Sequence, residues 1–196
     1  FDFMFLPPYY TLTIADPDHV LTVFVYLGVA IVTSQLVARV RARTLLAERE
    51  IQRALTRMAR AMDERDWPAV DDLMLPEATA DLGMGMISGR AEIVAFIRTF
   101  LDDCGPTQHL LGNILIEVDG DVATSRCYVS DMHKGQGDKA HLSFSTLSDY
   151  HDRWRKVDGR WMMSHRTKLN RAHIGDIRVL GPGPVATSPA AAKERP

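Results

Sequence analysis

The stretch TQHLLGNILIEVDGDVATSRCYVSDMH, residues 107–133, indicates the fold class. Apolar and polar residues alternate on both sides of Asp119-Gly120, and alternation of this kind is typical of half-buried strands. An Asp-Gly pair between two such runs predicts a type I′ hairpin turn. A similar pair of runs, with Asp158-Gly159 between them, fills residues 141–170. The sequence therefore predicts two long antiparallel strand pairs.

Helical patterns precede these strands. Five apolar residues fall on one face of a helix, namely Ile51, Leu55, Met58, Ala59 and Met62. Asp66-Trp67-Pro68 is expected to end this helix and to begin a short one that Pro76 ends. A third helix is expected between Ser88-Gly89 and Gly105-Pro106. Helices first and long antiparallel strands after predict an α+β domain, with a curved antiparallel sheet wrapped around three helices.

Composition excludes some classes of function. The chain has 196 residues, a net charge of −2 and an isoelectric point near 6.4. This charge balance gives no electrostatic case for nucleic-acid binding. The two cysteines, Cys104 and Cys127, fit no metal-binding spacing, and we expect both to be reduced.

An uncharged segment occupies residues 20–38. At 1.5 Å per residue it spans about 28 Å, close to the thickness of a bilayer core. Asp16 and Pro17 suit the start of a helix, and Arg39, Arg41 and Arg43 follow its end. Because basic residues stay on the cytoplasmic side, we expect a transmembrane helix that enters the cytoplasm after residue 38. A buried helix or the remnant of a signal peptide is the alternative.

The N-terminal residues carry a recognisable pattern. It consists of Phe1, Phe3 and Phe5 before Pro7-Pro8, then TIADP at 13–17, and ARVR at 38–41. Over residues 1–50 this resembles the end of the membrane-sensor region of bacterial potassium-responsive sensor histidine kinases. The resemblance implies a bacterial inner-membrane anchor, with the soluble part in the cytoplasm. No kinase motif follows. We expect an anchor at 1–50, a soluble domain at 51–177 and a disordered tail at 178–196.

Strand alternation sorts the polar residues of the hairpins by face. One face of the second strand carries Ala123, Ser125, Cys127, Val129, Asp131 and His133. This mostly small face is expected to be concave, with His133 at its end. In the next strand Leu142, Phe144, Thr146, Ser148 and Tyr150 share a face. By the same count, His109 faces the same way as Leu111, Asn113 and Leu115.

A second resemblance covers residues 51–177. It rests on Asp63, Asp66 and Trp67 in AMDERDW, on T-Q-H-x-x-G at 107–112, and on Asp158-Gly159 before Trp161. These residues resemble the SnoaL-like branch of the nuclear-transport-factor-2-like superfamily, a cone of one bent sheet and three helices around a pocket. The closest functional pattern is that of scytalone dehydratase. It implies that Asp63, His109 and His133 are catalytic and that Ser148 contacts substrate.

The chain departs from that pattern at three positions. Met62 and Leu82 stand where scytalone dehydratase has tyrosines that hold a water against the substrate carbonyl, and Tyr150 replaces a pocket asparagine. We expect His109 to act as a general base oriented by Asp63, and His133 as the acid. Six residues are expected to contact substrate, namely Asp81, Met84, Asn113, Phe144, Ser148 and Tyr150. We expect no cofactor and no metal, because no ligand spacing supports one.

Three functions remain open. The first is a lyase or isomerase that dehydrates, isomerises or cyclises a small, largely apolar molecule. The second is a non-catalytic small-molecule-binding module on a membrane protein, favoured by the absent tyrosines. The third is an interaction domain that forms a homodimer through the outer face of its sheet.

Overall fold

The structure is a computed structural model that describes residues 17–183, with side chains from residue 20 onward. The expected cap at Asp16, the aromatic pattern before it and residues 184–196 lie outside the described part. The chain divides into two compact units, residues 1–46 and 47–196, and the second therefore starts four residues before the expected domain.

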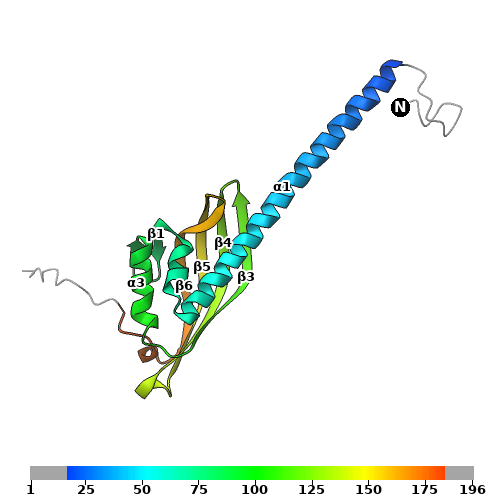
Figure 1. The fold of residues 1–196 in the computed structure, drawn as a ribbon. Coiled ribbons are helices and arrows are strands. Elements are labelled where there is room, and N and C mark those ends of the chain that lie inside the picture. The colour runs from blue at the N-terminus through cyan, green and yellow to red at the C-terminus, as the bar shows by residue number, and fades with distance from the viewer. Residues whose placement is uncertain (1–16, 184–196) are drawn as a thin grey trace, which may run out of the picture. The chain divides into compact units, whose positions relative to one another are not determined.

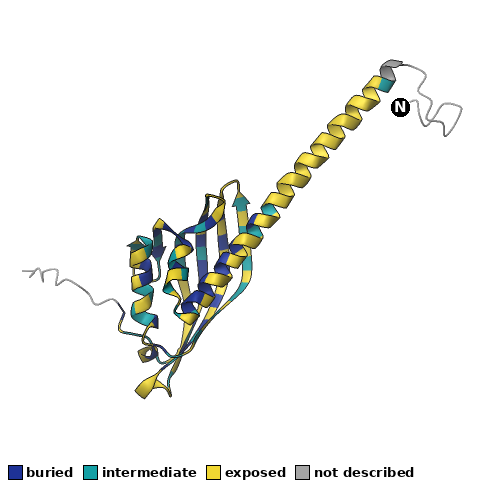
Figure 2. Ribbon diagram, in the orientation of Figure 1, coloured by how far each residue is buried: buried dark blue, intermediate teal, exposed yellow. Residues whose placement is uncertain are grey.

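Helix α1 runs from Pro17 to Glu64 and contributes to both units. Residues 21–43 of the first unit are exposed throughout, as Figure 2 shows by colour. In the described part of the chain, α1 is the one helix long and apolar enough to cross a membrane, with a mean hydropathy of 2.1 in its most apolar window. An exposed apolar helix of this length is what a membrane anchor requires.

The second unit contains a six-stranded sheet with the strand order β2-β1-β6-β5-β4-β3. Its strands are β1 (Met74–Asp81), β2 (Met86–Ser88), β3 (Thr107–Asp119), β4 (Val122–Lys134), β5 (Ser143–Val157) and β6 (Arg160–Gly175). The C-terminal part of α1, with α2 (Trp67–Asp72) and α3 (Arg90–Leu101), covers one face of this sheet (Figure 1). The predicted α+β fold with three helices is confirmed.

The core of this unit lies between helix α1 and the sheet. Ile51, Leu55 and Met58, three of the residues predicted to share a helical face, are at most 2% exposed. Across from them, Trp154 is 1% exposed and its indole N–H donates to the Ser125 hydroxyl at 2.9 Å. Every second residue of β4 from Ala123 to His133 is buried, which confirms the predicted inner face.

The sequence pattern did not reveal strands β1 and β2. Strand β1 differs from expectation in two ways. Strand β1 pairs with β6 in parallel, so the sheet is mixed rather than wholly antiparallel. Pro76 lies inside β1 and does not end α2, which finishes at Asp72. A proline is tolerated there because the register of β1 against β6 is interrupted between Met74 and Thr79.

The hairpin turns differ from each other. Asp158 and Gly159 both have positive φ, as the predicted type I′ turn requires. In the other hairpin Asp119 pairs with Val122, so the loop is Gly120-Asp121, and of these two residues Gly120 alone has positive φ. This is the pattern of type II′, and the prediction of type I′ was wrong at this turn.

A short C-terminal helix, η2 (Ile177–Val179), overlaps the start of the segment expected to be a disordered tail. Val179 is fully buried and packs in a small cluster with Cys104 and Phe144. The chain is therefore still packed against the second unit at Val179.

Candidate active site

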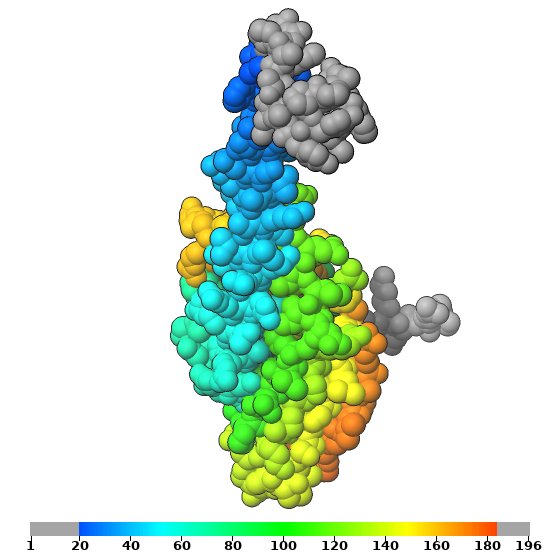
Figure 3. Space-filling model, turned by 90° about the vertical axis from the view of Figure 1, so that its right-hand side faces the viewer, coloured from blue at the N-terminus to red at the C-terminus, as the bar shows by residue number. Residues whose placement is uncertain are grey.

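Asp63 in the last turn of α1 pairs with His109 near the start of β3. The Asp63 Oδ1 atom lies 2.7 Å from Nδ1 of His109, and Oδ2 accepts the backbone N–H of the same residue at 2.9 Å. Figure 3 shows the end of α1 (cyan) directly beside β3 (green) on the surface of this unit. The helix end and the strand start are therefore held together by the two residues that the resemblance singled out.

Thr107 and Arg65 fix this pair in place. The Thr107 hydroxyl donates to Asp63 Oδ1 at 3.0 Å and accepts from the Arg65 guanidinium at 2.9 Å. Arg65 takes a left-handed backbone conformation after α1, and its side chain also donates to the carbonyl oxygens of Leu101 and Gly105. One arginine thus joins the end of α1, the end of α3 and the start of β3.

The charge state of Asp63 sets the tautomer of His109. Burial alone would raise the pKa of the Asp63 carboxyl, but the hydrogen bonds from His109 and Thr107 outweigh it and hold the pKa below its ordinary value of 3.8. An ionised carboxylate only accepts, so in the neutral ring His109 Nδ1 carries the hydrogen and Nε2 keeps the lone pair. A lone pair of this kind is what a general base needs.

His109 forms part of the wall of a cavity of about 430 Å³. Its side chain is only 5% exposed, whereas Asp63 is 19% exposed and lies outside the cavity wall. Asp63 instead borders a surface groove between α1 and β3, which Thr107 and Gln108 also line. The imidazole therefore separates the cavity from the carboxylate behind it.

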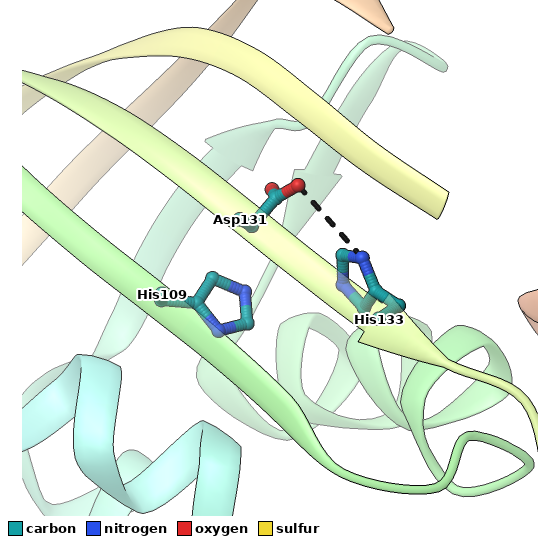
Figure 4. Close-up of side chains that lie close together, drawn as sticks. All are labelled: His109, Asp131 and His133. Carbon is teal, nitrogen blue, oxygen red and sulfur yellow. Dashed lines mark ion pairs between the residues drawn. The ribbon is translucent and has the colours of Figure 1, made fainter. Parts of the chain in front are cut away.

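His133 and Asp131 lie next to His109 on the neighbouring strand (Figure 4). The two imidazole rings are perpendicular, with centroids 5.7 Å apart, and His133 Nδ1 lies 3.8 Å from Asp131 Oδ1. Burial lowers the pKa of His133, and the negative charge of Asp131 only partly opposes this effect. His133 is therefore mainly neutral at pH 7.

Asp131 is fully buried and completely hydrogen-bonded. Its Oδ1 accepts from the backbone N–H and hydroxyl of Thr146 at 2.8 and 2.6 Å, and its Oδ2 accepts from Lys168 Nζ at 2.8 Å. Burial alone would raise the pKa of Asp131, but the Lys168 charge and these hydrogen bonds hold it below 3.8.

Three side chains in this cluster have the right donor atoms for a metal ion. One ligand atom each from His109, Asp131 and His133 lies within 4.8 Å of the others. Two imidazoles and a carboxylate suit several divalent transition metals. The Lys168 ammonium, however, already neutralises Asp131 and would repel a cation placed beside it. The site fits proton transfer better than metal binding.

Comparison with known sequences identifies the second unit. The sequence profile of the SnoaL-like domain matches residues 43–167, which is more than half of the chain. The chain belongs to the SnoaL-like domain family. A second profile, a domain of unknown function (DUF4118), matches residues 1–50 and agrees with the expected membrane-sensor segment.

Relatives of the SnoaL-like unit share its fold. An uncharacterised protein of Mycobacterium tuberculosis is 31% identical over 121 residues, which are 61% of this chain and 82% of that protein. Among solved structures, a protein of Novosphingobium aromaticivorans proposed to be a scytalone dehydratase has a TM-score of 0.59 at 21% identity, covering 67% of this chain and 88% of that one. A hexachlorocyclohexane dehydrochlorinase of Novosphingobium barchaimii has a TM-score of 0.60 at 16% identity, covering 67% and 91%. Other structures of this fold are described as NTF2-like.

The other residues expected to contact substrate divide into two groups. Met84, Phe144 and Tyr150 line the cavity of the SnoaL-like unit, although Met84 is 66% exposed at its mouth. Asp81 does not line it and instead accepts the backbone N–H of Gly83. Ser148 is buried behind the wall, where its hydroxyl donates to Asn170 at 2.7 Å.

Asn113 was placed on the wrong face. Its φ of 50° and the interrupted register between Gly112 and Leu115 mark a bulge in β3. The bulge reverses the alternation, so Asn113 and Leu115 are exposed while Ile114 turns inward. Neither exposed residue faces the cavity that His109 lines.

Several site residues were missed at the level of sequence. Asp131 had the correct parity beside His133 but no assigned role, and Thr107 was part of the matched motif. Lys168 and Asn170 line the cavity from β6, and only their alternation along that strand could have indicated them.

Proposed function

We propose that the SnoaL-like unit is a lyase or isomerase that removes a proton from carbon next to a carbonyl group in a small, largely apolar molecule. The observation that supports this most is the 2.7 Å contact between Asp63 Oδ1 and His109 Nδ1, with His109 on the cavity wall. The apolar part of the wall, which includes Phe96, Phe100 and Phe144, suits a ring compound.

The proposed reaction begins at His109. Nε2 takes the proton from carbon, the carbon–hydrogen electron pair moves into an enolate, and Asp63 stabilises the imidazolium that forms. In an isomerisation the same imidazolium returns the proton to another carbon. In a dehydration the neighbouring hydroxyl leaves as water after accepting a proton, and solvent must then carry the His109 proton back to the donor.

His133 is the expected proton donor in the dehydration. Its Nδ1 lies 3.3 Å from the Phe144 carbonyl oxygen, so Nδ1 carries a hydrogen and Nε2 can donate only when the ring is an imidazolium. Burial lowers the pKa of this ring, so the donating form is scarce at pH 7 and becomes more abundant as the pH falls. We therefore expect the protonation of the leaving hydroxyl, a step that isomerisation does not use, to accelerate as the pH falls from 7 towards 6.

Hydrogen exchange tests the first step without knowledge of the natural substrate. The full chain in detergent would be incubated in D₂O with small ring ketones, and deuterium uptake next to the carbonyl followed by mass spectrometry. His109→Gln and Asp63→Asn should each slow exchange about 10²-fold or more. Glu64→Gln is the matched control, because Glu64 is the exposed neighbour of Asp63. Exchange that is equally fast in His109→Gln would refute the proposed base.

A non-catalytic binding module is the second candidate. Met62 and Leu82 line the cavity where scytalone dehydratase has tyrosines, so those two positions offer no donor to a substrate carbonyl. A ketone that raises the unfolding temperature of the chain but shows no deuterium uptake would favour this function.

A further inference from the structure

Lys168 places an ammonium group in the wall of the cavity. Its side chain is 17% exposed, and Nζ donates to Asp131 Oδ2 at 2.8 Å. An ammonium has three N–H donors, and Asp131 is its single hydrogen-bond partner among the described residues. Two donors therefore stay available to a molecule in the cavity.

The other two cationic side chains of the cavity wall each pair with a carboxylate. Arg166 donates twice to Asp152, both at 2.8 Å, and its guanidinium stacks 4.0 Å from the centre of the Tyr150 ring. Arg171 pairs with Asp149, and its side chain is 62% exposed. Among the described cavity-lining lysines and arginines, Lys168 thus combines a partly buried side chain with a single hydrogen-bond partner.

Asn170 lies two residues further along the same face of β6 and also lines the cavity, although this residue is exposed. Its Oδ1 accepts from Ser148, whose hydroxyl lies 3.2 Å from that of Thr146. This bond fixes the orientation of the amide, so the NH₂ group is the free end. Lys168 and Asn170 together present N–H donors, and one buried network through Asp131, Thr146 and Ser148 holds both.

We propose that Lys168 and Asn170 form an oxyanion-binding subsite, which takes the oxygen of a carbonyl group and binds its enolate more tightly. The subsite would supply hydrogen-bond donors to the substrate carbonyl oxygen, which the side chains of Met62 and Leu82 cannot provide. Its catalytic use rests on the proposed function, because an enolate forms only if His109 removes the proton. Its preference for an anionic oxygen does not depend on His109.

The protonation state of Lys168 suits a role as a hydrogen-bond donor rather than as a nucleophile. Burial alone would lower the pKa of the ammonium, but the charge of the Asp131 carboxylate and its hydrogen bond to Nζ raise this pKa above its ordinary value of 10.5. A lysine that stays protonated cannot form a Schiff base. It can stabilise negative charge that develops on an oxygen, because its donors are held in place before the reaction begins.

Binding of 4-nitrophenol tests the subsite, because its phenolate resembles an enolate and absorbs at a different wavelength from the phenol. The full chain in detergent would be titrated near neutral pH, with empty micelles as the blank and nitrobenzene as the uncharged probe of the same ring. Lys168→Met should weaken phenolate binding about tenfold to hundredfold and leave nitrobenzene binding unchanged. Lys168→Arg should retain most of the phenolate affinity, and Asn170→Ala should lose less than Lys168→Met.

Lys168→Met leaves Asp131 buried without its cation, so that variant could lose the fold. The double variant Asp131→Asn/Lys168→Met removes both charges and keeps an acceptor for Thr146. Phenolate affinity in this double variant equal to that of the unaltered chain would overturn the proposal. His109→Gln distinguishes the subsite from the proposed base, because this variant should slow deuterium exchange about 10²-fold or more while phenolate binding persists.

Discussion

Replacement of Asp63 by asparagine should destabilise the second unit and change the tautomer of His109. Asp63 accepts three hydrogen bonds, two at Oδ1 and one at Oδ2 from the backbone N–H of His109. An asparagine keeps one oxygen, so its NH₂ group must face a donor that was satisfied before. An unsatisfied buried donor costs about 1–3 kcal/mol, and the two remaining bonds lose their charge assistance. We expect a loss of about 2–4 kcal/mol in the free energy of unfolding.

Tryptophan fluorescence during urea titration of the full chain in detergent measures this loss. All three tryptophans, Trp67, Trp154 and Trp161, belong to the second unit, so the signal reports its unfolding alone. The pKa of Asp63 is lowered by folding, so its contribution is present above pH 3.8 and disappears as the pH falls through the folded pKa. The difference between the free energies of unfolding of the two proteins should therefore be full at pH 6 and should shrink as the pH falls below 3.8.

Nitrogen-15 spectra of the histidine side chains provide the second readout. In the unaltered chain the His109 ring should carry its proton on Nδ1, and in Asp63→Asn a substantial share should carry it on Nε2. A loss of stability below about 0.5 kcal/mol, within the range of ordinary surface changes, would refute the argument from these hydrogen bonds. An unchanged tautomer would refute the role of Asp63 as the group that orients the base.

Three further predictions concern other parts of the chain. Folding lowers the pKa of His133, so the unfolded chain binds a proton at this histidine more readily than the folded chain does. The free energy of unfolding should therefore fall as the pH drops below 6.5. His133→Gln should reduce this fall between pH 7 and 5 in the same urea titration. Thr107→Val removes one of the hydrogen bonds to Asp63, whereas the same Arg65 nitrogen keeps its bonds to the Met62 and Asp63 carbonyl oxygens. Deuterium exchange should therefore slow about threefold to tenfold, much less than in Asp63→Asn. The full chain should remain with bacterial membranes after an alkaline wash, and Leu27→Arg should release part of it, because a central arginine costs about 2.5–3.5 kcal/mol on insertion.

Local patterns were sufficient for the elements whose pairing is also local. The hairpins β3–β4 and β5–β6 each join strands across a two-residue loop, so alternation and a turn signal defined them. The buried stripe of α1 followed from helical spacing for the same reason. Side-chain chemistry was less accessible, since the contact of Asp63 with His109 joins residues 46 positions apart and came from a family resemblance rather than from any pattern.

The sequence by itself determined the α+β class, the apolar span in α1, the hairpins and the inner face of β4, because each depends on residues that are neighbours in the chain. The tertiary structure alone decided that β1 joins β6 in parallel, that a bulge turns Asn113 outward, and that Lys168 meets Asp131. These features depend on strands that are distant in sequence, whose register is set by packing against the helices. Charges brought together in this way within a buried wall have no signature in any single stretch of sequence.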